Sequence, residues 1–122
     1  MLIAFWIVAG LAALAFFAAG IMKAVRPKPA LAAGGMGWVD DFSGSNVTLI
    51  GVAEVVGALG LVLPVLTGIA PILSPIAGIA LTVLMIGAVV THVRRQETPV
   101  PPLVLGLLAA AASVLGFFVV LA

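Results

Sequence analysis

The sequence predicts an all-α protein, a transmembrane bundle of four helices. Of its 122 residues, 65% are hydrophobic, and only five are basic and four acidic. A water-soluble domain carries charge on about a quarter of its residues, so a soluble globular enzyme and a disordered chain are both excluded. The absence of cysteine excludes a disulfide scaffold, and a net charge of +1 provides no basic surface for nucleic acid.

The number of spans follows from the uncharged stretches. Residues 1–22 and 98–122 contain no Asp, Glu, Lys or Arg, and residues 42–93 contain only Glu54. About 20 apolar residues are needed to cross the hydrocarbon of a bilayer. The first and last stretches therefore each fit one helix, and the middle stretch fits two helices joined by a turn.

A cluster of helix-breaking residues marks that turn. Pro64, Gly68, Pro71 and Pro75 follow one another closely, and proline removes a backbone donor and disfavours helix in the residue before it. We therefore read the chain as a single domain, 1–122, with helices over residues 2–24, 47–63, 72–93 and 102–121.

The connection between the first two helices spans residues 25–46. A structureless loop of this length is unusual in a compact protein, so we expect a short element within residues 30–42 that lies in the membrane interface. Residues 43–46 form a turn rich in Ser, Gly and Asn, which provides an N-cap for the second helix.

The basic residues predict the orientation. Lys23, Arg26 and Lys28 lie at the end of the first helix and in the connection that follows, Arg94 and Arg95 lie in the third connection, and the remaining connection and both tails have none. The positive-inside rule assigns these two connections to the cytoplasm, so both termini should lie on the non-cytoplasmic side. The charges follow the first apolar run rather than precede it, which favours a retained helix over a cleaved signal peptide.

Several kinds of chemistry have no residues to support them. Without cysteine there is no thiolate metal site or iron–sulfur cluster, and His92 is the only histidine, so the chain cannot provide two histidine axial ligands to haem. No arrangement of nucleophile and base is recognisable. We therefore predict no catalytic residues, no metal site and no intrinsic cofactor.

One polar cluster stands out. Glu54 lies about seven residues into the predicted second helix, or roughly 10 Å along it, which places it in the hydrocarbon region. Charged residues at such depth usually face the bundle interior and mark function, although an ion pair can also serve packing alone. Lys23 and His92 end their helices at the same cytoplasmic level. The three side chains should form a polar patch, or Lys23 and Glu54 a structural ion pair.

An apolar pocket should lie above this patch. Small residues near Glu54 allow another helix to approach, and helical spacing places further residues on the faces of Lys23 and His92. The expected pocket lining is Phe16, Gly20, Gly51, Gly57, Ala58, Met85 and Ala88.

Several stretches of the chain resemble the DoxX-like family of small four-helix membrane proteins. They are GMGWVDDF at residues 35–42, IGVAEVVGALGLVLP at 50–64, TGIAP at 67–71 and MIGAVVTHVRR at 85–95. Lys23 fits a lysine that such proteins often carry after the first helix. The resemblance implies a redox association, since some related proteins are subunits of thiosulfate:quinone oxidoreductase or membrane partners of redox enzymes. Because the chain has no redox ligands of its own, electron transfer would need a quinone or a partner subunit, and the protein would be at most a subunit of a membrane oxidoreductase.

These observations lead to one main functional hypothesis and two alternatives. We expect a multi-pass protein of the bacterial inner membrane that binds a quinone-like or other apolar small molecule, a lipid, or a redox partner around Glu54. The alternatives are a structural accessory subunit of a larger complex and a small-solute transporter. Small residues four apart on the last helix, Gly106 with Ala110 and Ala112 with Gly116, fit either a homo-oligomer face or an internal seam.

Overall fold

The computed structural model describes residues 1–122 and contains helices only. Their order is α1 (Leu2–Val25), α2 (Lys28–Ala33), the 3₁₀ helix η1 (Gly37–Asp41), α3 (Gly44–Thr67), α4 (Leu73–Arg94) and α5 (Val100–Leu121). The helices α1, α3, α4 and α5 are long and apolar enough to cross a membrane. The prediction of an all-α bundle with four spans is therefore confirmed. In place of the single short element predicted within residues 30–42 there are two short helices, α2 and η1, and their position in a membrane interface stays a prediction.

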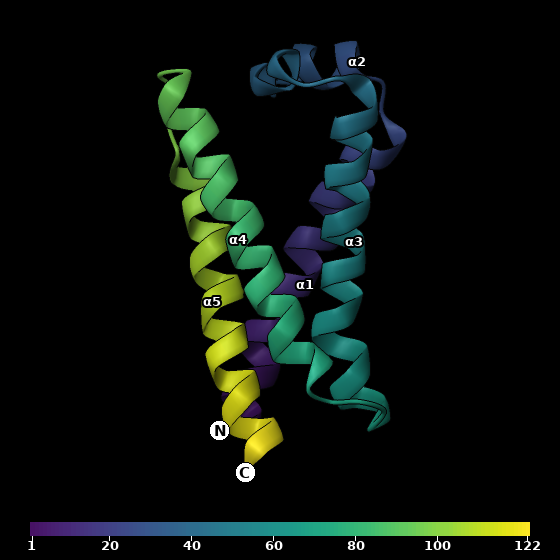
Figure 1. Cartoon of the computed structure of the whole chain (residues 1–122), viewed down its shortest axis with the longest axis vertical. Coiled ribbons are helices and arrows are strands. Elements are labelled where there is room, and N and C mark those ends of the chain that lie inside the picture. Colours follow the sequence, from purple (N-terminus) through teal and green to yellow (C-terminus); the bar gives the residue numbers. More distant parts are fainter.

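The four long helices form two closely packed pairs. Helix α1 packs along α3, and α4 packs along α5; the pairs meet through α1 with α5 and α3 with α4. Both termini and the α3–α4 turn lie at one end, which we call the terminal end (Figure 1). The opposite end, which we call the polar end, carries α2, η1 and the α4–α5 connection. Helices α3 and α4 diverge toward this polar end.

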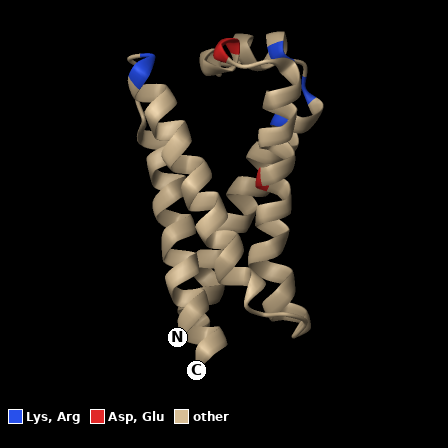
Figure 2. Cartoon of the chain, viewed as in Figure 1, with Lys and Arg blue, Asp and Glu red and all other residues tan.

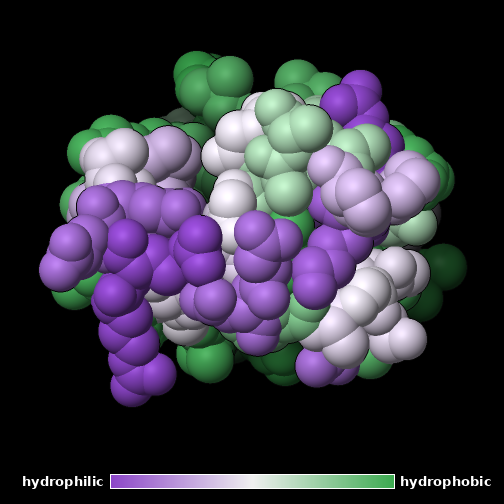
Figure 3. Space-filling view, turned by 90° about the horizontal axis from the view of Figure 1, so that it is seen from above, coloured by the Kyte–Doolittle hydropathy of each residue, from purple (hydrophilic) through white to green (hydrophobic).

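The charged residues follow the same division. Lys, Arg, Asp and Glu are collected at the polar end, with a single acidic residue, Glu54, deeper in the bundle (Figure 2). Viewed onto the polar end, the surface is largely hydrophilic and is rimmed by apolar residues (Figure 3). The two basic connections therefore lie at one end, as an even number of spans between them requires. The side of the membrane that this end faces stays a prediction.

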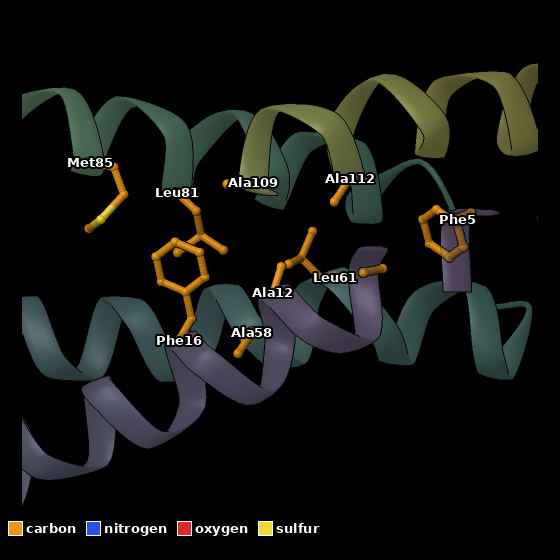
Figure 4. Packing of buried hydrophobic residues seen from close by; sticks show 10 residues of the cluster. Phe5, Ala12, Phe16, Ala58, Leu61, Leu81, Met85, Ala109 and Ala112 are labelled. Atoms are coloured by element: carbon orange, nitrogen blue, oxygen red, sulfur yellow. The ribbon is translucent and has the colours of Figure 1, made fainter. Parts of the chain in front are cut away.

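The core is built from all four long helices. Phe5 and Phe16 of α1 pack with Leu61 of α3 and Leu81 of α4 against small residues of α5, and these side chains are almost fully buried (Figure 4). A Cβ added to Gly116 would lie 3.4 Å from both Phe5 and Pro75. The small residues Ala112 and Gly116 therefore form an internal seam rather than an exposed face.

Helices α1 and α3 approach backbone to backbone. A Cβ on Gly20 would lie 2.6 Å from the Gly51 carbonyl oxygen, and a Cβ on Gly51 would lie 2.6 Å from the Gly20 carbonyl oxygen. Any side chain at either position would push the helices apart. This reciprocal contact explains why small residues are needed on both faces.

Helix α3 is longer than predicted at both ends. The Ser43 side chain accepts a hydrogen bond from the Asn46 amide, so the helix begins at Gly44. The prediction that Pro64 belongs to the turn was wrong, because this proline lies inside α3. The helix ends instead before Gly68, whose φ of 72° is the left-handed conformation that glycine adopts readily.

Two buried serines join the helices near the terminal end. Ser74 Oγ of α4 donates to the Leu61 carbonyl of α3 at 2.7 Å, and Ser113 Oγ of α5 donates to the Pro75 carbonyl of α4 at 2.8 Å. The first bond lies within one turn of Pro64. Serine hydroxyls commonly supply hydrogen bonds to backbone near prolines in membrane helices.

Candidate functional site

A cavity of about 560 Å³ lies at the polar end, within the space where the helix pairs diverge. Its walls come from all four long helices, and η1 with its flanking residues lies over it. The lining residues are Ala19, Lys23, Gly35, Met36, Trp38, Phe42, Ile50, Glu54, Leu84, Met85, Gly87, Ala88, Thr91, His92, Pro101, Pro102 and Leu105. Most of this lining is apolar, and the ionisable residues in it are Lys23, Glu54 and His92.

Lys23 and Glu54 form a buried ion pair across α1 and α3. Lys23 Nζ donates to Glu54 Oε1 at 2.5 Å, and the side chains are 10% and 0% exposed, respectively. Glu54 is ten residues beyond the start of α3, or roughly 15 Å along it, so it lies near the middle of a hydrocarbon layer about 30 Å thick. This is deeper than the sequence predicted, because α3 begins earlier.

The second carboxylate oxygen has no partner. Glu54 Oε2 is fully buried and accepts no hydrogen bond from the protein. A buried acceptor without a donor costs about 1–3 kcal/mol. The carboxylate is therefore only half satisfied by Lys23.

Trp38 connects the lysine to the histidine. Lys23 Nζ lies 5.7 Å from the centroid of the Trp38 ring, within the range of a cation–π interaction, and the His92 ring centroid lies 6.4 Å from the Trp38 ring. Phe42 packs edge-on against the same tryptophan. The segment around η1 thus places an aromatic side chain against both polar groups of the cavity wall.

The histidine is oriented by its own helix. His92 Nδ1 lies 2.9 Å from the Ala88 carbonyl oxygen. A carbonyl only accepts hydrogen bonds, so Nδ1 must carry the hydrogen. In the neutral ring Nε2 is then an acceptor, and no protein group donates to it. A neutral His92 is therefore available to a ligand as a hydrogen-bond acceptor through Nε2.

An ion-pair network joins η1 to the α4–α5 connection. Arg95 donates to Asp41 at 2.8 Å and to Glu97 at 3.2 Å, and its guanidinium lies against Gly37. Hydrogen bonding to Glu97, and the charges of Asp41 and Glu97, raise the pKa of Arg95 further above its usual range. Arg95 therefore stays charged and holds the segment around η1 over the cavity.

The structure brings together only part of the predicted site. Lys23, Glu54, His92, Met85 and Ala88 all line the cavity. The other five predicted lining residues do not, because they are used where helices contact one another. Phe16 and Ala58 lie in the core, Gly20 and Gly51 form the α1–α3 contact, and Gly57 abuts Leu81, whose side chain would lie 2.6 Å from an added Cβ.

Sequence reasoning missed the contribution of two segments. Met36, Trp38 and Phe42 cover the cavity from above, and Pro101 and Pro102 line it from the first turn of α5. A signal for the first group was present, since aromatic residues interrupt a glycine-rich stretch between two spans. Nothing in the sequence indicated that this stretch folds inward over the bundle.

The arrangement can bind a small apolar molecule with a polar end. It offers one ammonium donor, one imidazole acceptor and one carboxylate, held by three helices. No three His, Cys, Asp or Glu side chains gather where they could hold a metal ion. The fold and the cavity define a multi-pass, helical membrane protein with an internal pocket at its polar end.

A comparison with models of protein families shows which family this chain is related to. The model of the DoxX-like family matches residues 7–116, and the chain belongs to that family. No curated protein and no solved structure matches the chain. The match includes α3 and α4 in full, most of α1 and α5, and every residue of the cavity wall.

Proposed function

We propose that this DoxX-like protein binds a quinone-like or other apolar small molecule in the cavity at its polar end. The observation that carries the proposal is the cavity itself: about 560 Å³ of mostly apolar wall that ends on the buried Lys23–Glu54 pair. Ligand pockets typically measure about 300–1,000 Å³, with apolar walls and a few convergent polar groups.

The charge distribution supports a binding role. An ionisable residue within a membrane span marks function by default, because its burial is costly. Glu54 retains an unpaired oxygen despite the adjacent ammonium of Lys23. The costly burial of this charge pair beside an apolar cavity therefore supports a binding role.

The cellular setting follows from the same reasoning. We place the protein in the inner membrane of a bacterium, with the polar end toward the cytoplasm because all five Lys and Arg residues lie at this end. The chain has no cysteine and a single histidine, so a redox role would depend on the bound molecule or on a partner enzyme.

The two alternatives have less support. An accessory subunit would present a large face of small residues to its partner, but Gly20, Gly51, Ala112 and Gly116 are all buried within this chain. A transporter would need a polar path through both halves, and the terminal half of the bundle carries no charged side chain (Figure 2).

The test compares what co-purifies with the wild type and two matched variants. Ala88→Phe places a ring on the cavity wall, and Ala80→Phe makes the same change on an exposed surface of the same helix. Native mass spectrometry should find a small molecule on the wild type and on Ala80→Phe, and none on Ala88→Phe. If all three carry only the same bulk phospholipids, the accessory-subunit hypothesis replaces this one.

A further inference from the structure

We infer that the cavity selects a molecule whose polar end carries a hydroxyl hydrogen, as a phenol or a quinol does, over one that offers only carbonyl or ether oxygens. The inference rests on the proposed function, since it names the head-group chemistry of the same site. It depends on which hydrogen-bonding groups of the wall are already used and which are free.

The free nitrogen of His92 is the first of these groups. The Ala88 carbonyl holds the hydrogen on Nδ1, so Nε2 of the neutral ring can only accept. His92 is half-buried on the cavity wall, beside the Trp38 ring. A ligand that fills the cavity removes water from this nitrogen and must replace the hydrogen bond that the water made. A hydroxyl can donate that bond, whereas a carbonyl or an ether cannot.

Lys23 supplies the complementary donor. Its ammonium has three hydrogens, and Glu54 Oε1 is its single hydrogen-bonding partner. Lys23 and His92 both border the cavity beside the Trp38 ring. A hydroxyl, a carbonyl and an ether oxygen can each accept from Lys23. Only a head group with a hydroxyl hydrogen can also donate to His92.

The remaining polar groups of the cavity wall do not change this preference for a hydroxyl-bearing head group. The Thr91 hydroxyl already donates to the Gly87 carbonyl at 3.0 Å. Glu54 has no exposed surface, and its unpaired oxygen adds a second acceptor rather than a donor. The free hydrogens of Lys23 and the indole N–H of Trp38 can serve a hydroxyl, carbonyl or ether oxygen alike, so the discrimination rests on the His92 Nε2 acceptor. Leaving a buried acceptor unpaired costs enough to change affinity by about tenfold.

The experiment uses two probes that differ in this single hydrogen, a long-chain alkylphenol and its methyl ether. Each is titrated against the full-length protein in detergent, and binding is measured by native mass spectrometry. We expect the wild type to bind the phenol about tenfold more tightly than the ether. His92→Phe keeps a ring beside Trp38 but has no acceptor, so it should bind both probes equally. Thr82→Val removes a hydroxyl that donates to the Gly78 carbonyl of the same helix and does not line the cavity, so it is the matched control and should retain the preference.

Each other outcome has a distinct meaning. Equal binding of phenol and ether to the wild type overturns this inference and leaves the proposed function standing. Loss of the preference in Thr82→Val, or its retention in His92→Phe, overturns the assignment to His92. Failure of the wild type to bind either probe overturns the inference together with the proposed apolar binding site.

Discussion

Removing one member of the Lys23–Glu54 pair should destabilise the protein far more than replacing both. Lys23→Met leaves a carboxylate with no exposed surface and no partner on either oxygen. Breaking a buried pair in this way costs about 3–5 kcal/mol in the free energy of unfolding. Glu54→Leu should cost somewhat less, because the lysine side chain is 10% exposed and keeps its contact with Trp38.

The double variant Lys23→Met with Glu54→Leu replaces the ion pair by two apolar side chains of similar size. Such replacements are often neutral, because they remove the desolvation cost of both charges. We expect the double variant to lie within about 1 kcal/mol of the wild type. The coupling energy between the two positions should then be at least about 3 kcal/mol.

The assay is reversible unfolding in mixed micelles, with SDS as the denaturant and helix content followed by circular dichroism. The control cycle uses Arg95→Gln and Asp41→Asn, an exposed pair whose coupling should stay below about 1 kcal/mol. Additive effects at Lys23 and Glu54, within about 0.5 kcal/mol, would show that the two residues are not energetically coupled and would refute this reasoning.

Three further predictions concern packing, hydrogen bonding and orientation. Gly20→Ala should destabilise the same unfolding transition by about 1–3 kcal/mol, because the added methyl meets α3 backbone, whereas Gly10→Ala, which meets nothing, should be neutral or stabilising by up to about 1 kcal/mol. Equal effects would contradict the close α1–α3 contact. Ser74→Ala should cost about 1 kcal/mol by removing the hydrogen bond between α4 and the Leu61 carbonyl of α3, and an unchanged unfolding curve would show that this bond contributes nothing. A cysteine added after Ala122 should react with an impermeant thiol reagent in intact cells, and Ser43→Cys should not; reversed labelling would invert the orientation.

The sequence by itself determined the number of spans and the end of the bundle at which the basic residues gather. Charges cannot remain in hydrocarbon without partners, so uncharged stretches of sufficient length had to be spans, and two basic connections separated by two spans had to share an end. The same reasoning associated Lys23, Glu54 and His92 before any contact was known, although Glu54 lies deeper than predicted. Local rules placed the N-cap of α3 within residues 43–46, but they began the helix three residues late and misjudged Pro64. A proline inside a membrane helix is tolerated when other groups supply hydrogen bonds, and Ser74 is separated from it by the turn and belongs to the next helix.

Only the tertiary structure decided which helix faces meet and where the cavity lies. In a soluble helix, the contrast between apolar and polar faces identifies the buried side. Here Leu11 is 55% exposed and Leu61 is fully buried, yet both are equally suited to lipid and to the core. For the same reason the sequence could not tell that Gly20 and Gly51 form a helix contact while Ala88 lines a cavity. The segment 35–42 is held over that cavity because Trp38 contacts Lys23 and His92, and because Asp41 accepts a hydrogen bond from Arg95. These partners are far apart in the chain, so the contacts have no local signature in the sequence.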